Sequence, residues 1–411
     1  PGKFYALPQS PQIYKQLLMI AGFDRYIQLA RCFRDEDLRA DRQPEFTQID
    51  LEMSFAETED IMEMAEGFIS RLFSEILGRD IPVPLPRMKY TEALERFGSD
   101  KPDTRFGMEI TDLTDVVKDC GFGVFTSAIA NGGTVRCITA KNGASTFTRK
   151  EIDKLTEYVK GIGVKGLAYI RWVEDAPNCS FGKFLGEGEL DKILAAAGAE
   201  KGDVVFIIAD KKNTALTSLG ALRLKCARQL NIIPEGKFNF LWITEFPFFE
   251  WNEETQHWDA MHHPFTMPMD ECLQYLDTAP EKVFAKAYDL VLNGTELSSG
   301  SIRITDYELQ QKMFESLGLT DEEIEAKFGF LVEAYKYGAA PHGGMGIGLD
   351  RLAMIMCGAD SLRDVTAFPK VQNASELMSN CPAAVDKDSL DILGIEVTKS
   401  EIGRASCRER V

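Results

Sequence analysis

The strongest pattern of hydrophobic and polar positions lies between residues 26 and 55. Residues 26–33 (YIQLARCF) are rich in strand formers, and residues 48–55 alternate strictly between polar and apolar side chains. A period of two predicts an extended strand with two different faces. One face is expected to be buried, and the other polar; the apolar positions are Ile49, Leu51, Met53 and Phe55. The two runs therefore predict a hairpin joined by residues 34–45.

The segment 34–45 is longer than an ordinary hairpin loop and densely charged. Loops of this length are usually functional or disordered, and Pro44 before the returning strand favours a fixed exit. A solvated charged turn without further role is the alternative interpretation.

Two helices are predicted beside these strands. Ser10 and Pro11 are typical of a helix start and precede QIYKQLLMIA, which Gly22 closes. Lys15 lies in this helix, where a solvated lysine is the simplest interpretation. Residues 58–77 have apolar side chains spaced for one buried helical stripe.

A second hairpin is predicted at residues 288–304. Residues 288–292 alternate like a strand, Asn293 and Gly294 favour a tight turn, and residues 301–304 form the returning strand. This places Asp289 and Glu296 on neighbouring strands. Paired carboxylates suit Mg²⁺, which takes oxygen ligands and retains some waters, when nucleotide phosphates lie nearby.

Glycines and histidines mark two further segments. Residues 341–356 (PHGGMGIGLDRLAMIM) predict a nearly bare strand, open to a planar base or a phosphate, followed by a helix from Asp350. Neither a dinucleotide fingerprint nor a Walker A motif is present. His262 and His263 are adjacent, so on a strand they would point to opposite faces and not share a metal. The alternative to a histidine that faces a substrate is that both histidines have a purely structural role.

Composition limits the class of protein. The chain has 411 residues, 45% hydrophobic and 27% charged, which predicts two or three globular domains. No long apolar run or signal sequence is present, so we expect a cytoplasmic protein without membrane contact. Nine cysteines without paired spacing favour reduced thiols over structural zinc. A net charge of -18 disfavours a nucleic-acid partner but leaves room for a local basic surface.

Several strings together resemble one family. FRDEDLRADRQPEFTQID (residues 33–50), GSDKPD (98–103) and GLDR (348–351) are similar to motifs of bacterial-type aspartyl enzymes among the class II aminoacyl-tRNA synthetases. The resemblance covers residues 1–395. It implies an α+β fold, with an antiparallel sheet flanked by helices and interrupted by an inserted α+β domain.

The resemblance also implies a domain layout. Residues 1–110 and 229–398 would form the two parts of the catalytic core. Residues 111–228 resemble an insertion shared with an amidotransferase subunit, whose role stays open. Residues 399–411 change in character and are expected to be a non-native or disordered tail. The family's anticodon-binding domain and first dimer motif precede the equivalent of Pro1, so the chain resembles a fragment of a homodimeric protein.

Site residues carried over from the family fall into four sets. Arg34 and Arg351 would be catalytic, since a guanidinium fork matches the charged oxygens around phosphorus. The ATP set is Arg34, Asp35, Glu36, Gln43, Glu296, Gly348, Leu349, Asp350 and Arg351. The aspartate set is Gln12, Lys15, Arg34, Asp50, His262 and Arg303. Asp289 and Glu296 would hold Mg²⁺.

The resemblance predicts an aspartate–tRNA ligase that uses ATP and Mg²⁺. It would join L-aspartate to tRNA(Asp), and possible charging of tRNA(Asn) is left open. Two alternatives stand beside it: an ATP-dependent amidation that forms asparagine on the same scaffold, and a non-catalytic tRNA-binding relative.

Overall fold

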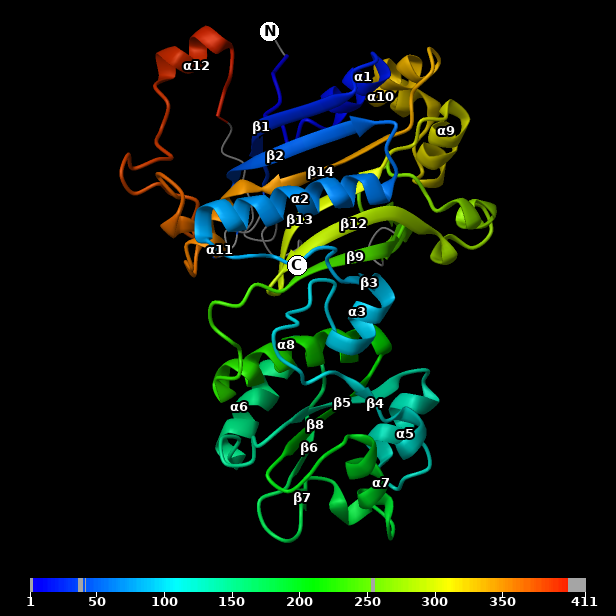
Figure 1. Cartoon of the computed structure of the whole chain (residues 1–411), viewed down its shortest axis with the longest axis vertical. Coiled ribbons are helices and arrows are strands. Elements are labelled where there is room, and N and C mark those ends of the chain that lie inside the picture. Colours follow the sequence, from blue (N-terminus) through cyan, green and yellow to red (C-terminus); the bar gives the residue numbers. More distant parts are fainter. Residues whose placement is uncertain (1–2, 36–39, 41, 253–255, 398–411) are drawn as a thin grey trace. The chain divides into compact units, whose positions relative to one another are not determined.

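The computed structural model describes residues 3–35, 40, 42–252 and 256–397 (Figure 1). The chain divides into two compact units. The smaller comprises Pro1–Pro11, Leu29–Ile49 and Gly348–Val411, and the larger comprises Gln12–Gln28 and Asp50–Ile347.

A seven-stranded sheet lies at the centre of the larger unit. Each of its strands contributes residues to that unit. The strand order is β1-β2-β14-β13-β12-β9-β3. The bounds are β1 Arg25–Phe33, β2 Glu45–Ser54, β3 Arg87–Lys89, β9 Phe240–Pro247, β12 Phe284–Leu292, β13 Thr295–Ile302 and β14 His342–Gly348. The pairs β12–β9, β12–β13 and β13–β14 are antiparallel, and β3 is parallel to β9. The predicted antiparallel sheet is therefore confirmed.

Helix α2 (Thr58–Leu77) packs on this sheet and has the bounds that its apolar period predicts (Figure 1). Ile61, Ala65 and Ile69 are fully buried. Glu66, also buried, accepts a hydrogen bond from Nε1 of Trp242 on β9 at 3.0 Å. The predicted hairpin turn is confirmed as well, since Asn293 and Gly294 have φ of 53° and 84° between β12 and β13.

A separate five-stranded sheet lies between β3 and β9 in the sequence. Its order is β4-β5-β8-β6-β7, and its helices surround it. The strands are β4 Thr111–Asp112, β5 Thr134–Ala140, β6 Ala168–Arg171, β7 Asn178–Cys179 and β8 Val204–Asp210. The helices are α4 Thr114–Val117, α5 Gly123–Ala130, α6 Arg149–Lys160, η1 Gly182–Phe184, α7 Glu189–Ala196 and α8 Lys212–Leu230.

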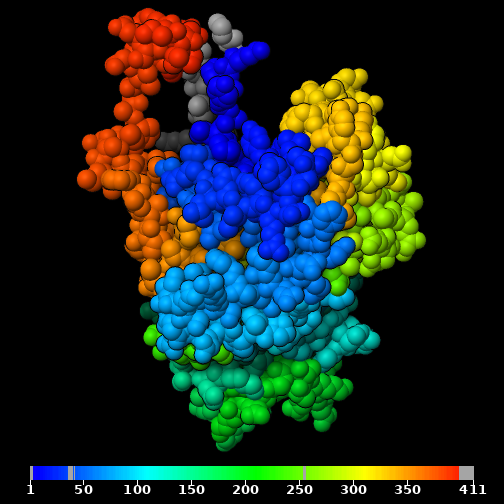
Figure 2. Space-filling model, turned by 45° about the horizontal axis from the view of Figure 1, so that its top comes forward, coloured from blue at the N-terminus to red at the C-terminus, as the bar shows by residue number. Residues whose placement is uncertain are grey.

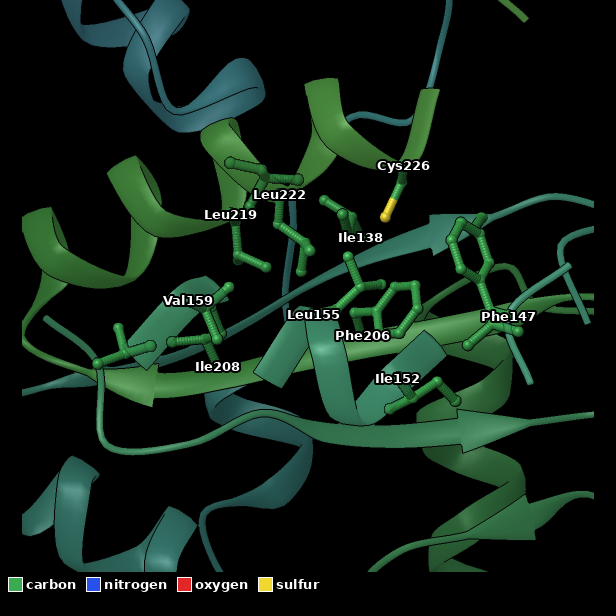
Figure 3. Close-up of a cluster of buried hydrophobic side chains, with 14 of the residues drawn as sticks. Ile138, Phe147, Ile152, Leu155, Val159, Phe206, Ile208, Leu219, Leu222 and Cys226 are labelled. Carbon is green, nitrogen blue, oxygen red and sulfur yellow. The ribbon is translucent and has the colours of Figure 1, made fainter. Parts of the chain in front are cut away.

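One core cluster of this inserted part is built from apolar side chains. Ile138 on β5 and Phe206 on β8 pack with Leu155 on α6 and Leu219 on α8, and all four are 0% exposed (Figure 3). In the space-filling view its teal and green residues gather into one continuous body (Figure 2).

The remaining elements complete the two units. They are α1 Gln12–Ile20, α3 Tyr90–Phe97, β10 Phe249–Asn252, β11 His257–Ala260, η2 Asp270–Tyr275, η3 Pro280–Lys282, α9 Tyr307–Ser316, α10 Asp321–Tyr335, α11 Leu349–Met356, η4 Leu362–Asp364 and α12 Lys387–Leu393. Among the described helices, none combines the length and apolar character that crossing a bilayer requires.

Two predictions about the first hairpin are wrong. Phe55 is 77% exposed because the chain leaves the strand there with a φ of 56°. The polar face of β2 is buried instead: Asp50 and Glu52 are 3% and 0% exposed. A period of two separates the faces of a strand but does not say which face has a partner.

Candidate functional site

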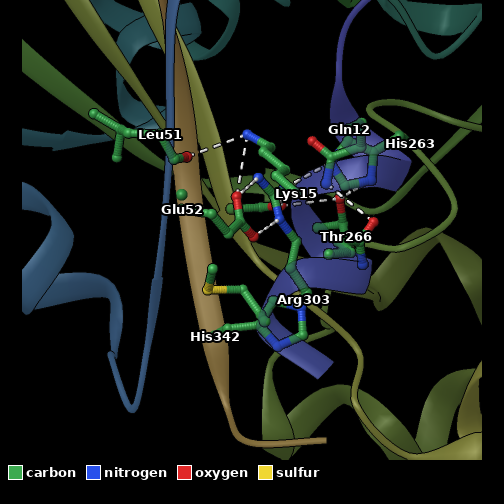
Figure 4. A network of polar contacts seen from close by, with 12 residues as sticks. Gln12, Lys15, Leu51, Glu52, His263, Thr266, Arg303 and His342 are labelled. Atoms are coloured by element: carbon green, nitrogen blue, oxygen red, sulfur yellow. Dashed lines mark hydrogen bonds and ion pairs between the residues drawn. The ribbon is translucent and has the colours of Figure 1, made fainter. Parts of the chain in front are cut away.

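Four charged side chains form a buried network in the larger unit (Figure 4). Lys15 on α1 lies 2.6 Å from Asp50 Oδ1 and 3.1 Å from Glu52 Oε2 on β2. Arg303, just after β13, donates from Nε to Glu52 Oε1 at 2.8 Å and from Nη2 to Oε2 at 3.1 Å. All four are at most 3% exposed. Two cations and two carboxylates therefore balance within one buried cluster.

Glu52 links the two cations, and the family-based assignment did not include it. Burial favours the neutral acid, but the charges of Arg303 and Lys15 prevail and lower the pKa of Glu52 to about 2. Burial raises the pKa of Asp50, and Lys15 only partly offsets this effect. The strict alternation of β2 was the available signal, since it places Asp50 and Glu52 on one face.

The interpretation of Lys15 as a solvated helix lysine is wrong. Its side chain is buried, and its Nζ also donates to the Leu51 carbonyl at 3.2 Å. Gln12, one turn earlier on the half-buried start of α1, donates to Gln16 Oε1 at 3.0 Å. The structure thus brings Lys15, Asp50 and Arg303 together, as the aspartate set requires.

His263 contacts this network, although His262 was the predicted residue. Both follow β11 and neither lies on a strand as expected: His262 lies in a bend, and His263 lies outside any regular element. Arg303 Nη1 lies 2.7 Å from His263 Nε2. A guanidinium only donates, so Nε2 accepts and the ring proton is on Nδ1, 3.3 Å from Thr266 Oγ1. Burial and Arg303 hold the pKa of His263 well below its ordinary value, which keeps the ring neutral.

His262 has a different environment. Its ring packs edge-on against Phe246 at 4.9 Å, and its Nδ1 has no hydrogen-bond partner among the described residues. Burial lowers the pKa of His262 to about 4, although the charge of Glu296 acts in the opposite direction. A neutral imidazole with an unsatisfied nitrogen is suited to bind a polar ligand group, so the assignment of His262 stays a prediction.

Asp289 on β12 pairs with Ser299 on β13, and Glu296 on β13 pairs with Val291 on β12, so the two carboxylates lie two residues apart along β12 and are not direct partners. Asp289 is 7% exposed, and its Oδ1 has no hydrogen-bond partner in the described part of the chain. Burial, followed by the charge of Glu296, raises the pKa of Asp289 well above its ordinary value. A buried carboxylate oxygen without a partner beside a second carboxylate suits a hard cation. No described group of three or more His, Cys, Asp or Glu residues could hold a metal, so other ligands would have to complete such a site.

Two glycines of β14 do not leave room for a ligand, contrary to expectation. A Cβ on Gly344 would lie 2.1 Å from both the Leu51 carbonyl and Glu52 Oε2, and one on Gly343 would lie 2.5 Å from Ile302 Cδ1. The bare strand therefore accommodates neighbouring strands and the Glu52 carboxylate.

Apart from Glu296, which lies in the larger unit, the described residues of the predicted ATP set lie in the smaller unit. The Arg34 amide donates to the Pro44 carbonyl at 2.8 Å, and its guanidinium lies 5.0 Å from the centre of the Phe46 ring. These contacts fix Arg34 at the mouth of the charged segment. Asp35 is exposed next to it, and Glu36 lies outside the described residues.

Helix α11 positions the other end of the predicted ATP set. Gly348 caps it, Leu349 begins it, and Arg351 lies in its first turn. Asp350 Oδ2 accepts from the Thr47 amide on β2 at 2.7 Å, which fixes the helix start to the strand.

Gln43 has a structural role in this unit. Its side chain is 4% exposed; its Oε1 accepts from the Lys370 amide at 2.8 Å and its Nε2 donates to the Lys370 carbonyl at 3.1 Å. Glu45 also pairs with Lys370 and, at 2.8 Å, with Arg31. These bonds lower the pKa of Glu45. Together they attach the segment around residue 370 to the returning strand.

This arrangement of motifs is that of a known protein class. The family model described as tRNA synthetases class II (D, K and N) matches residues 1–372, and the chain belongs to this family.

Within the family, similar relatives are named as ligases that join aspartate to tRNA. The chain is 59% identical over 400 residues to the aspartate–tRNA ligase of Ruminiclostridium cellulolyticum, covering 97% of this chain and 67% of the relative. It is 55% identical over 402 residues to that of Clostridium perfringens, covering 98% and 67%. A relative from Caldanaerobacter subterraneus subsp. tengcongensis, 55% identical over 397 residues with coverage of 97% and 67%, is named aspartate–tRNA(Asp/Asn) ligase. The predicted resemblance is confirmed, and the chain spans about two thirds of the length of these relatives.

Proposed function

We propose that this chain carries the aspartate-activating part of an aspartate–tRNA ligase. The reaction joins L-aspartate to ATP as aspartyl-adenylate with release of pyrophosphate, and then transfers the aspartyl group to the 3′ end of tRNA. The observation that carries the proposal is the buried pair of cations Lys15 and Arg303, held by one carboxylate, Glu52. The names of the relatives, all of them aspartate–tRNA ligases, agree with it.

The network suits the side chain of aspartate. Glu52 accepts hydrogen bonds from Nε and Nη2 of Arg303, while Nη1 of Arg303 contacts His263. A substrate carboxylate can accept from donors of Arg303 and Lys15, whereas the amide group of asparagine would direct its own N–H donors at them. Asp50, whose pKa burial raises, is stabilised in its charged form by a substrate ammonium group. Gln12 is expected to assist Asp50 there, and Arg34 to hold the α-carboxylate.

The remaining roles concern ATP. Arg34 and Arg351 are assigned to neutralise charge around the phosphates, with Asp35, Glu36, Gln43 and residues 348–350 contributing to nucleotide binding. Asp289 and Glu296 would hold Mg²⁺, and the partnerless Oδ1 of Asp289 fits a cation ligand. A bound Mg²⁺ would supply charge neutralisation of the phosphate oxygens.

Bond changes in the first step are simple. An oxygen of the aspartate α-carboxylate attacks the α-phosphorus, the bond from that phosphorus to the bridging oxygen breaks, and pyrophosphate leaves with the bond electrons. No covalent link to the protein is needed, so positioning and electrostatics provide the acceleration. Whether tRNA(Asn) is also charged stays open, because relatives of both names match this chain at 55% identity or more.

Aspartate-dependent exchange of pyrophosphate into ATP tests the proposal, with and without ammonia and tRNA. Exchange with aspartate alone, followed by charging of tRNA, is the expected result. Exchange that leads to asparagine only when ammonia is added would favour the amidation alternative. Binding of tRNA without any exchange would favour the non-catalytic alternative.

A further inference from the structure

One arginine of the inserted part is buried with no carboxylate partner among the described residues. Arg223 on α8 is 1% exposed, and its hydrogen bonds within the described part of the chain all go to backbone carbonyls. Nη2 donates to residues 103, 106 and 107 at 2.9, 2.9 and 2.8 Å, and Nε donates to Met108 at 3.1 Å. The guanidinium also lies 4.0 Å from the centre of the Phe106 ring and 4.9 Å from that of Phe97.

These carbonyls belong to the loop 99–108, which continues the GSDKPD string. Burying a charge is costly unless hydrogen bonds satisfy it, and here the observed conformation of the loop supplies the acceptors. Burial lowers the pKa of Arg223 to about 10, which reflects this cost. The loop conformation and the position of Arg223 therefore depend on each other.

The contact between α8 and the start of the loop is as close as backbones permit. A Cβ on Gly98 would lie 2.0 Å from the Leu216 carbonyl oxygen, and one on Gly220 would lie 2.5 Å from the Gly98 carbonyl oxygen. Neither position can accept a side chain without moving backbone. Helix α8 is thus fixed against the end of α3, directly before the loop begins.

The other side of the loop contacts the hairpin of the proposed metal carboxylates. Asp103 Cβ lies 3.1 Å from the position that a Cβ of Gly294 would occupy. The Thr104 carbonyl accepts a hydrogen bond from the side-chain Nδ2 of Asn239 at 3.2 Å. The backbone N–H of Asn239 donates to Asn293 Oδ1 at 2.9 Å. Lys101 Nζ lies 3.9 Å from Glu296 Oε2. The loop therefore brings a cation beside Glu296.

We infer that Arg223 is a positioning residue: through the loop 99–108, the inserted part sets where Lys101 and Glu296 stand relative to Asp289. The metal role of these carboxylates rests on the proposed function. The contacts from Arg223 to the loop and from the loop to the hairpin are independent of the proposed function. An arginine is required because a lysine has no planar fork that could reach four carbonyls at once.

The test compares Arg223→Met and Arg223→Lys with a control, Arg228→Met, in the full chain. Arg228 lies on the same helix but is exposed. Hydrogen exchange is measured for residues 99–108 and 293–296, together with the Mg²⁺ concentration for half-maximal pyrophosphate exchange. We expect Arg223→Met to accelerate hydrogen exchange at least 10-fold in both segments. The Mg²⁺ concentration for half-maximal pyrophosphate exchange should rise about 5-fold, while the aspartate KM stays within 2-fold of that of the unmutated chain. Arg223→Lys should show part of each effect and Arg228→Met neither.

Two outcomes would overturn the inference. One is an unchanged rate of hydrogen exchange in residues 99–108 or 293–296 of a folded Arg223 variant. The other is loss of protection across the whole seven-stranded sheet in both Arg223 variants, which would indicate a general structural role. If the unmutated chain showed no pyrophosphate exchange, the proposed function would fail, while hydrogen exchange would still decide this inference.

Discussion

Replacing Glu52 by Gln should destabilise the larger unit strongly. Gln keeps the size of the side chain but removes the charge that faces Lys15 and Arg303, both buried. The carboxamide also presents an N–H₂ group to cations that can only donate. Arg303 and Lys15 would then share Asp50 as the sole remaining carboxylate of the network.

Two figures indicate how much free energy of unfolding is lost: one follows from the pKa of Glu52, and the other is typical of buried ion pairs. The pKa of Glu52 falls from 4.5 to about 2 on folding. At about 1.36 kcal/mol per unit, this difference corresponds to about 3 kcal/mol of the free energy of unfolding. Breaking a buried ion pair by removing one partner typically costs about 3–5 kcal/mol. We therefore expect Glu52→Gln to lower the free energy of unfolding by about 3–5 kcal/mol at pH 7.

The dependence on pH has a definite sign. Because the pKa of Glu52 is lower in the folded state, its contribution is complete above about pH 4.5 and is lost as the pH falls towards 2. The difference between the unmutated chain and Glu52→Gln should therefore shrink over this interval. Urea unfolding followed by tryptophan fluorescence measures it, since Trp242 is fully buried in the same sheet.

A matched control is Glu75→Gln, which removes an exposed partner of Arg71 on α2. Pairs of this kind contribute at most about 1 kcal/mol. The reasoning is refuted if Glu52→Gln costs no more than this control at pH 7, or if the difference between the unmutated chain and Glu52→Gln stays constant down to pH 3.

Three further predictions concern the site and the thiols. Arg34→Ala should reduce aspartate-dependent pyrophosphate exchange roughly 100-fold or more with an unchanged melting temperature, since one fixed donor to the reacting phosphate is removed; equal exchange rates in both proteins would contradict the assignment. Arg303→Leu should impair aspartate activation far more than ATP binding, in a protein that prefers aspartate over asparagine by about 10⁴; steady-state kinetics with both amino acids measure this, and damage confined to the ATP KM would refute it. Burial raises the pKa of Cys137 to about 12, so it should resist a thiol reagent at pH 8 that labels the exposed Cys357 within minutes; peptide mapping that finds both labelled at one rate would show that the inserted core opens.

Local rules predicted much of the fold. The bounds of α2 follow from helical periodicity, and the turn at Asn293 and Gly294 follows from residues that tolerate positive φ. Both depend only on neighbours in sequence. The resemblance then supplied the sheet class, which no local pattern contains.

The buried network could not be predicted in the same way. Glu52 and Arg303 are 251 positions apart, and neither carries a local sign that the other will lie beside it. Alternation put Asp50 and Glu52 on one face of β2, and the polar face was taken as the open one. Lys15 illustrates the same limit, because a helix lysine appears solvated until a distant carboxylate is known. The assignment of Arg34, Arg351 and the two metal carboxylates stays a prediction that the experiments above address.

The balance of charge in the network affects how aspartate would reach it. Lys15, Arg303, Asp50 and Glu52 sum to zero within a few ångströms, so their fields largely cancel at a distance. The network would then exert little attraction on a ligand in bulk solution, and a chain of net charge -18 repels anions overall. Recognition of aspartate would begin only at contact, when the substrate displaces or shares the internal pairs. Such a site separates substrates by how slowly they leave more than by how fast they arrive.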